Sequence, residues 1–236
     1  MKLLKNWDNK NWLSSRSYIN SFNSFLLKRK KLCKRSQILD IGCGRGKIFG
    51  SISRKLKLTS KPIGIDSVFH KDVDKSIDFR NEDIFSFFNK NKTKFDLIMI
   101  KQTLHLFSDN KKIKLLKICK NKLTKKGVLI ILSLNTLDNQ IPCFKLMRRR
   151  LEKGLLRDTK MLKLISKILK NIKVNKFKFK VSISNRKYIQ MLKKKYISCL
   201  LNLTKKQINN GVKEIKSLYP NKIIFDDVLI CISFKN

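Results

Sequence analysis

Short apolar runs alternate with segments of helical periodicity along the first 134 residues of this 236-residue chain. A buried strand reads as four to eight apolar residues, whereas an amphipathic helix repeats its apolar side chains every three or four positions. By these criteria we expect strands at residues 37–41 and 61–66 and, as the fourth and fifth strands of the sheet, at 95–100 and 123–132, with helices at residues 47–58 and 111–122. Strands and helices that alternate in this way predict an α/β fold with a parallel sheet.

The pattern changes after residue 134. Residues 135–175 form a Leu-rich and Lys-rich stretch with a helical pattern and no run typical of a strand, which predicts an insertion after the fifth strand. Alternation at 177–183 predicts a further strand, and the last strand is expected at 223–234. Helical patterns over 185–196 and 204–218 lie between these two strands.

The first 34 residues space their aromatic side chains as a helix would, and they end in a basic run. We interpret this segment as a helical cap, which either folds over a ligand or packs its aromatic rings on the sheet. The chain is thus expected to have four parts: the cap (1–34), a ligand-binding core (35–134), a helical insertion or lid (135–176) and a carboxyl-terminal part that completes the sheet (177–236).

A glycine-rich turn follows the first predicted strand. Residues 37–47 read Gln-Ile-Leu-Asp-Ile-Gly-Cys-Gly-Arg-Gly-Lys. Glycine takes positive φ freely and lets a ligand approach the backbone closely, so Gly42, Gly44 and Gly46 predict a bend built for contact. The free amides of the following helix then face the ligand. A dinucleotide fingerprint would place its third glycine at the position of Lys47, which weakens that interpretation.

Three carboxylates are spaced along the strand ends. Asp40 is suited to hold an ammonium or, through water, an amino-acid head group, although it could be a solvated strand-end residue. Asp66 follows about 20 residues after the turn, where this class of fold binds ribose hydroxyls. Asp83 with Ile84 could bind and cover an adenine ring, but a helix-capping Asp83 is the alternative.

The fourth strand leads into a loop with two candidate polar residues. Lys101 and His105 lie where loops face the ligand crevice of an open sheet. His105 is the one plausible base. Its alternative role is structural, in which it seals the pocket wall through a hydrogen bond. Lys101 could equally be a strand-end charge in water. His70, the other histidine, lies in a polar stretch and is expected at the solvated surface.

In order and spacing, the glycine turn, Asp66, the Glu82-Asp83-Ile84 segment and the strands at 95–100 and 123–132 resemble class I S-adenosylmethionine-dependent methyltransferases over residues 35–134. The segment after the fourth strand resembles the small-molecule branch (methyltransferase type 11/25-like). No Asn-Pro-Pro-Phe or Asp-Pro-Pro-Tyr box, usual in enzymes that methylate base amines, stands there. The resemblance implies a Rossmann-like seven-stranded, mostly parallel sheet with helices on both faces, S-adenosyl-L-methionine as cofactor and methyl transfer to a small-molecule acceptor, with a carboxylated metabolite plausible.

The resemblance also implies site residues, by position in this chain. The expected cofactor-binding set is Asp40, Gly42, Cys43, Gly44, Gly46, Asp66, Ser67, Asp83, Ile84 and Lys101. His105 is the expected catalytic residue if the acceptor must lose a proton. The expected acceptor-binding residues are Trp12, Tyr18, His105, Phe144, Arg148 and Tyr188.

Charge opens a competing interpretation. The net charge of +40 would attract phosphates, so an RNA or ribosome-associated methyltransferase is the alternative function. Lys is abundant throughout, which favours a general drift of composition. The charge is still uneven, because residues 40–109 hold 13 basic against 9 acidic residues. A protein that only binds the donor or a partner, without catalysis, is the third possibility.

The six cysteines show no metal-binding spacing, so we expect no metal site and a reduced, cytoplasmic setting. The amino terminus carries Asp8 and lacks a continuous apolar core, so neither a signal peptide nor a membrane span is expected. The acceptor atom and the oligomeric state do not follow from the sequence.

Overall fold

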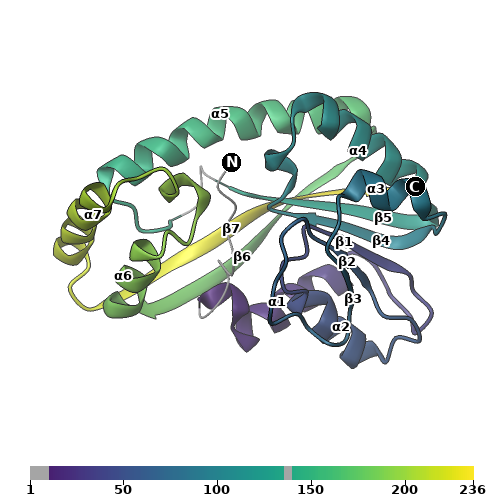
Figure 1. Ribbon diagram of the computed structural model, residues 1–236, viewed down its shortest axis with the longest axis horizontal. Helices are drawn as coiled ribbons and strands as arrows, with labels where there is room; N and C mark the ends of the chain where they lie inside the picture. The colour runs from purple at the N-terminus through teal and green to yellow at the C-terminus, as the bar shows by residue number, and fades with distance from the viewer. Residues whose placement is uncertain (1–10, 136–139) are drawn as a thin grey trace.

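A seven-stranded sheet forms the centre of the computed structural model, which describes residues 11–135 and 140–236 (Figure 1). The strand order is β3-β2-β1-β4-β5-β7-β6. Neighbouring strands are parallel except that β7 runs antiparallel to both β5 and β6. The strands are β1 (Ile38–Ile41), β2 (Ile63–Ile65), β3 (Asp78–Arg80), β4 (Phe95–Lys101), β5 (Leu123–Leu134), β6 (Lys173–Ser184) and β7 (Lys222–Lys235). The predicted mostly parallel, seven-stranded sheet is confirmed.

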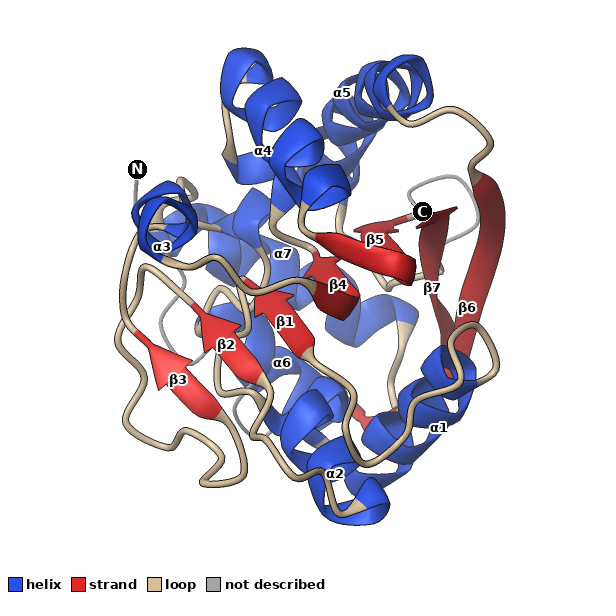
Figure 2. Cartoon of the chain, turned by 90° about the vertical axis from the view of Figure 1, so that its right-hand side faces the viewer, coloured by secondary structure: helices blue, strands red, loops and turns tan. Residues whose placement is uncertain are grey.

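Helices cover both faces of this sheet (Figure 2). The α-helices are α1 (Arg16–Leu27), α2 (Lys47–Leu56), α3 (Ile84–Lys90), α4 (Asp109–Asn121), α5 (Lys145–Ile168), α6 (Asn185–Lys193) and α7 (Lys205–Leu218). Three short 3-10 helices are η1 (Trp12–Ser14), η2 (Leu104–Leu106) and η3 (Ser198–Leu200). Helix α7 begins with a capping box, in which Thr204 and Gln207 satisfy each other's backbone amides.

The core consists of two apolar layers separated by the sheet. On β4, Leu97 and Met99 face the layer beneath α1 and α2, whereas Ile98 and Ile100 face the layer beneath α3, α4 and α5. Successive side chains of a strand point to opposite faces, so a strand covered on both sides is apolar at most positions. This is why residues 97–100 of β4 form a continuous apolar run, whereas the buried strand β1 is interrupted by one polar residue, Asp40.

The carboxyl-terminal strands β6 and β7 lie at one margin of the sheet and support a helical lobe. Strands β6 and β7 pair over twelve residues, and α6, η3 and α7 lie between them in the chain. In Figure 1 this lobe lies at the left, together with the start of α5. Strand β6 begins at Lys173, four residues before the predicted strand, because pairing with β7 continues to that point.

The helix expected after the fifth strand is α5, and its two halves pack on different layers. Met147, near its start, belongs to the layer shared with the lobe, whereas Met161 and Ile165 belong to the layer that covers the sheet beside α4. The predicted lid segment therefore also supplies sheet-covering side chains. Part of that segment, residues 136–139, and Trp7 of the predicted cap lie outside the described residues.

Candidate active site

The glycine turn after β1 adopts the positive-φ geometry that its sequence predicts. Gly42, Gly44 and Gly46 have φ values of 74°, 54° and 66°, in the region that favours glycine. A Cβ on Gly42 would lie 2.0 Å from Thr103 Oγ1, and one on Gly46 would lie 2.1 Å from Ile77 Cδ1. A Cβ on Gly44 would meet nothing within 4 Å. The middle glycine therefore borders open space, whereas the outer two are closed by packing.

Asp40 is a buried carboxyl group beneath this turn. Its side chain is only 4% exposed, and Oδ1 has no hydrogen-bond partner among the described residues. Burial raises the pKa of Asp40 to about 8, with Lys101 opposing the shift and Asp66 adding to it. A buried carboxylate is costly unless a cation or donor satisfies it. The solvated alternative for Asp40 is therefore wrong, and the group is suited to a positively charged ligand.

Asp66 joins the second strand to the glycine turn. Its Oδ2 accepts a hydrogen bond from Gly44 N at 2.8 Å, and its Oδ1 accepts one from Val68 N at 2.9 Å. The structure thus brings Asp40, Gly44 and Asp66 into one site at the carboxyl edge of the sheet, where ligands of this fold class bind. Ser67, the next predicted cofactor residue, is exposed.

His70 corrects a sequence prediction. It was expected at the solvated surface, but it is 3% exposed and its Nε2 lies 3.7 Å from Asp66 Oδ2. Its ring also stands edge-on to Phe79, with the centroids 6.4 Å apart. The polar residues around His70 gave no sign of this burial, and no local sequence signal pairs His70 with Asp66, because residues 66–70 form no helix.

Asp83 caps helix α3, as one of the two sequence interpretations proposed. Its Oδ1 accepts hydrogen bonds from Phe85 N at 2.8 Å and Ser86 N at 3.2 Å. Capping uses one oxygen of the Asp83 carboxylate. Binding of an adenine amino group by the other oxygen stays a prediction. Ile84, in the first turn of α3, is 4% exposed and belongs to the layer beneath α3 and α4.

Lys101 ends β4 beside the amino-terminal helix. Its Nζ lies 5.6 Å from the ring centres of both Tyr18 and Phe22. This distance is within the range of cation–π attraction. Lys101 also lowers the pKa of Asp40 through its charge. The ammonium group is thus placed between the aromatic cap and the buried carboxyl group, and its predicted contact with the cofactor stays a prediction.

His105 lies in η2, at the entrance to α4. Burial is the main cause that lowers its pKa to about 4, and the charges of Arg157 and Lys112 act in the same direction. The imidazole is therefore neutral at physiological pH and can accept a hydrogen bond. A group with so low a pKa has little affinity for a proton at neutral pH, which makes it a weak general base.

The predicted acceptor residues are spread over the cap and the lobe. Trp12 Nε1 donates to Asp227 Oδ2 at 2.9 Å, and Tyr18 packs edge-on against Phe177 and Phe179 of β6. The cap aromatics thus lie on the sheet, which was the simpler of the two sequence interpretations.

In the lobe, Tyr188 OH donates to Pro142 O at 2.5 Å and lies 3.0 Å from Tyr196 OH. Phe144 is 1% exposed, and its ring would be 2.5 Å from a Cβ on Gly211. Arg148 is exposed. Phe144 and Tyr188 therefore hold the lobe together, and contact of either with an acceptor stays a prediction.

Sequence reasoning missed two residues that shape this region. Asp227 is 3% exposed beneath Trp12, and Thr103 fills the space above Gly42. Two adjacent acids inside the apolar run of β7 were a signal for a buried carboxyl group at Asp227. Nothing in the sequence pairs Thr103 with Gly42, because their contact depends on the parallel pairing of β1 with β4.

A family profile described as "Methyltransferase domain" matches residues 32–195, which is more than half of the chain. The chain therefore belongs to the methyltransferase domain family. No curated protein sequence gives a significant match. The prediction of a class I S-adenosylmethionine-dependent methyltransferase is confirmed.

Solved structures share the fold along nearly the whole chain. The plantazolicin methyltransferase BpumL in complex with SAH is 20% identical, with 98% of this chain and 88% of that chain covered and a TM-score of 0.54. A SAM-dependent methyltransferase from Archaeoglobus fulgidus is 17% identical, with 94% and 95% covered and a TM-score of 0.54. Precorrin-6y C5,15-methyltransferase from Geobacter metallireducens GS-15 is 10% identical, with 96% and 92% covered and a TM-score of 0.54. At these identities the likeness supports the fold alone.

The residues at the carboxyl edge fit the donor. The unpartnered, buried Oδ1 of Asp40 is suited to the donor's amino-acid ammonium, directly or through water, and the open space at Gly44 admits close contact. Asp66, beside Gly44, carries a carboxylate suited to the ribose hydroxyls. No helix among the described residues has the length and apolar character needed to cross a membrane.

Asp66→Asn is expected to weaken donor binding roughly tenfold, because a charge-assisted hydrogen bond contributes about 1.5–3 kcal/mol. Asn keeps an oxygen for one of the two backbone amides that Asp66 accepts from and leaves the other without its acceptor, so the melting temperature should fall by several degrees while the protein stays folded. Titration calorimetry with S-adenosylhomocysteine gives the affinity. Asp72→Asn, an exposed acid in the same loop, is the matched control and should bind as the wild type does. Unchanged affinity in a folded Asp66→Asn protein would remove Asp66 from the ribose assignment.

Proposed function

We propose that this methyltransferase transfers a methyl group to a small-molecule acceptor, with carboxylated metabolites as the first candidates. The observation that carries the donor half of the proposal is the buried, unpartnered oxygen of Asp40 beside the open side of Gly44. The bound donor would supply an electrophilic methyl group. The protein then needs to align an acceptor with that methyl group, and alignment alone can contribute up to about 7–11 kcal/mol.

The loop after β4 supports a small acceptor. Residues 101–104 read Lys-Gln-Thr-Leu, and the chain turns at once into η2. Thr103 is fixed by a hydrogen bond from its Oγ1 to Lys101 O at 3.0 Å and by its packing on Gly42. The side chain is thus committed to supporting the glycine turn. No base-amine box stands at this position, which disfavours exocyclic amines of bases as acceptors.

The helical lobe also supports a small-molecule acceptor. Helix α7 packs on α6 and on α5, and Lys145 N at the start of α5 donates to Glu214 Oε2 of α7 at 2.9 Å. This bond places a carboxylate at the amino end of α5, where the helix dipole favours negative charge. A lobe held to the sheet by β6 and β7 can shape an acceptor site through its own residues. The BpumL structure, which is similar over 98% of this chain, is described as that of a plantazolicin methyltransferase.

Proton removal depends on the acceptor. A carboxylate or thiolate is already ionised and needs only to be oriented, whereas a hydroxyl or ammonium must first lose a proton. Because the pKa of His105 is about 4, this neutral side chain is better suited to donate a hydrogen bond from its ring N–H to an ionised acceptor than to remove a tightly held proton. The chemistry of the site therefore favours acceptors that are already ionised at neutral pH.

The acceptor class is tested by incubating the purified protein with a metabolite extract and a methyl-labelled donor. Label in the low-molecular-weight fraction, identified by mass spectrometry, is the expected result. The Asp40→Asn protein serves as the control, because it should lose label in proportion to its lost donor affinity. Label found solely in RNA or protein would contradict the proposal. Donor binding without any transfer would favour the non-catalytic function.

His105→Gln is expected to lower turnover by no more than about tenfold, because the Gln amide preserves a hydrogen-bond donor for an ionised acceptor. His105→Ala should be slower than His105→Gln. With the pKa of His105 at about 4, the wild-type rate should show no inflection from this group between pH 5 and 8. The measurement is kcat against pH with the labelled acceptor. A wild-type inflection near pH 6.5 that His105→Gln abolishes would instead make His105 the general base.

A further inference from the structure

The loops that lead into four of the parallel strands are basic and contain no Asp or Glu. They are residues 28–35 before β1, 57–61 before β2 and 92–94 before β4, together with residues 122–126, which include the first four residues of β5. Ten of their thirteen Lys and Arg side chains are exposed. Since parallel strands all begin at the same edge of a sheet, the topology gathers these loops on one side of the molecule. We call this surface the basic edge.

Hydrogen bonds join the loops of the basic edge to one another. Lys30 Nζ donates to Lys126 O at 2.8 Å, and Thr59 N donates to Lys34 O at 2.8 Å. The start of β4 contributes one acid to this side, Asp96, whose two oxygens accept hydrogen bonds from Gln37 N and Thr124 Oγ1. That carboxylate is therefore engaged within the protein. In Figure 2 the starts of β4 and β5 and the C-terminus face the viewer on this side.

Composition alone does not explain this arrangement. Asp40, Asp66 and Asp83 all lie at the opposite, carboxyl edge of the same sheet. A general preference for Lys would raise the positive charge at both edges, but these three carboxylates offset it at the carboxyl edge. The loop before β3, at the margin of the sheet, differs, because Asp78 begins that strand and pairs with Arg80 at 2.9 Å. The segregation of charge thus belongs to the central strands.

We propose that the basic edge binds the phosphate backbone of a nucleic-acid double helix. Neighbouring strands lie about 4.8 Å apart, so the starts of β2, β1, β4 and β5 span roughly 15 Å, enough to reach phosphates on both sides of a groove about 12 Å wide. The four loops contain no Phe, Tyr or Trp. Recognition of single strands relies on aromatic stacking, so these loops are suited to a duplex contacted through its phosphates.

This surface has a different role from methyl transfer. The glycine turn and Asp40 lie at the ends of the strands, whereas the basic edge lies at their starts. A duplex held at the basic edge is therefore held away from the donor site, and it serves as an anchor for the enzyme and not as the methyl acceptor. Phosphate contacts carry no sequence information, so duplexes of one form bind with similar affinity whatever their sequence.

The test measures the fluorescence anisotropy of a labelled 24-base-pair RNA duplex, and of the matching DNA duplex, between 50 and 200 mM NaCl. The wild type should bind both, with an affinity that falls steeply with salt. The test variant combines four substitutions at exposed positions of the basic edge: Lys31→Gln, Lys34→Gln, Arg35→Gln and Lys126→Gln. Its dissociation constant should rise at least tenfold, and its salt slope should fall by about four units.

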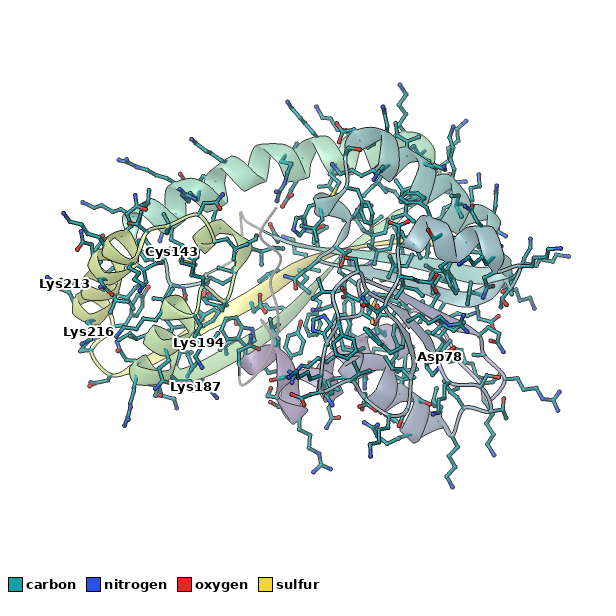
Figure 3. All side chains as sticks on the ribbon, viewed as in Figure 1. Asp78, Cys143, Lys187, Lys194, Lys213 and Lys216 are labelled. Carbon is teal, nitrogen blue, oxygen red and sulfur yellow. The ribbon has the colours of Figure 1, made fainter. Side chains whose placement is uncertain are left out.

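The matched control removes the same charge from the lobe. It combines Lys187→Gln, Lys194→Gln, Lys213→Gln and Lys216→Gln, four exposed lysines on or beside α6 and α7 that Figure 3 labels at the left of the molecule. This variant should bind the duplexes within about threefold of the wild type. Both variants should bind S-adenosylhomocysteine as the wild type does, which confirms that they fold.

Three results would overturn the proposal. The first is wild-type binding weaker than about 100 µM at 50 mM NaCl, the weak limit of non-specific nucleic-acid binding. The second is an equal loss in the two variants, which would reduce the effect to net charge. The third is tighter binding of polyglutamate or of an anionic vesicle to the basic edge than of either duplex. Donor binding is measured separately, so failure here leaves the proposed methyl transfer intact.

Discussion

Asp40→Asn is expected to weaken binding of S-adenosylhomocysteine by roughly 10- to 100-fold, the largest loss for any single polar substitution in the site. Asn has nearly the same shape but carries no charge, and a charge-assisted hydrogen bond contributes about 1.5–3 kcal/mol. Asp40 is 4% exposed, so water cannot replace the lost interaction easily. Titration calorimetry of the folded variant measures the effect. Affinity within twofold of the wild type would exclude Asp40 as the partner of the ligand's ammonium group.

The same substitution should stabilise the ligand-free protein at high pH. The pKa of Asp40 is about 8 in the folded protein, against an ordinary value of 3.8. Between these two values the folded state holds a proton that the unfolded state has lost, so the contribution of Asp40 to stability is full below about pH 4 and is lost as the pH rises through 8. Denaturant unfolding should show the wild type losing roughly 1 kcal/mol per pH unit relative to Asp40→Asn over this window. Parallel stability curves would contradict the buried, protonated state.

Proton release provides an independent measurement. If Asp40 is protonated in the free protein at pH 7, binding of an ammonium group should expel that proton, because an adjacent positive charge favours the carboxylate. Calorimetry in two buffers of different ionisation enthalpy should therefore detect proton release for the wild type and less for Asp40→Asn. Equal proton uptake in both proteins would mean that another group titrates.

Gly44→Ala and Gly42→Ala should separate ligand binding from folding. A methyl group on Gly44 enters open space, so the variant should lose only about 1 kcal/mol of stability from its positive φ, yet bind the donor at least tenfold more weakly because the methyl group occupies the ligand's side of the turn. A methyl group on Gly42 would lie 2.0 Å from Thr103 Oγ1. Strain and overpacking together should cost about 2–5 kcal/mol.

Thermal unfolding and calorimetry distinguish the two glycine variants. Gly44→Ala should melt close to the wild type while its affinity falls, and Gly42→Ala should melt many degrees lower. Gly154→Ala, at a helical position where a Cβ meets only the end of Arg157 at 3.8 Å, is a control that should leave both quantities unchanged or slightly raise stability. Unaltered donor affinity in Gly44→Ala would mean that the ligand does not approach the turn at this residue.

The order of strands and helices was predictable because each signal is local. The apolar runs of β1 and β4 reflect strands buried on both faces, and three alternating glycines specify the turn that follows β1. The role of Asp83 at the start of α3 was also recognised as one of two alternatives, since N-capping depends on residues within one turn. Such features need no knowledge of what the chain packs against.

The tertiary structure alone decided the electrostatic character of the site. The sequence places Asp40 at a strand end, but its raised pKa depends on burial by distant segments and on the charges of Lys101 and Asp66. The sequence does not distinguish the environments of His70 and His105. In the structure His70 is buried against Asp66, and burial is the main cause that lowers the pKa of His105. Desolvation depends on every atom nearby in space, and the sequence does not list those atoms.

The basic edge shows the same division. The sequence by itself determined that residues 28–35 and three other segments are positively charged and that each precedes or begins a strand. Only the parallel pairing of β2, β1, β4 and β5 brings the four loops to one edge and leaves Asp40 and Asp66 at the other. The physical reason is that charge is a property of each residue, whereas an electric field is a sum over positions, and positions are fixed by the fold.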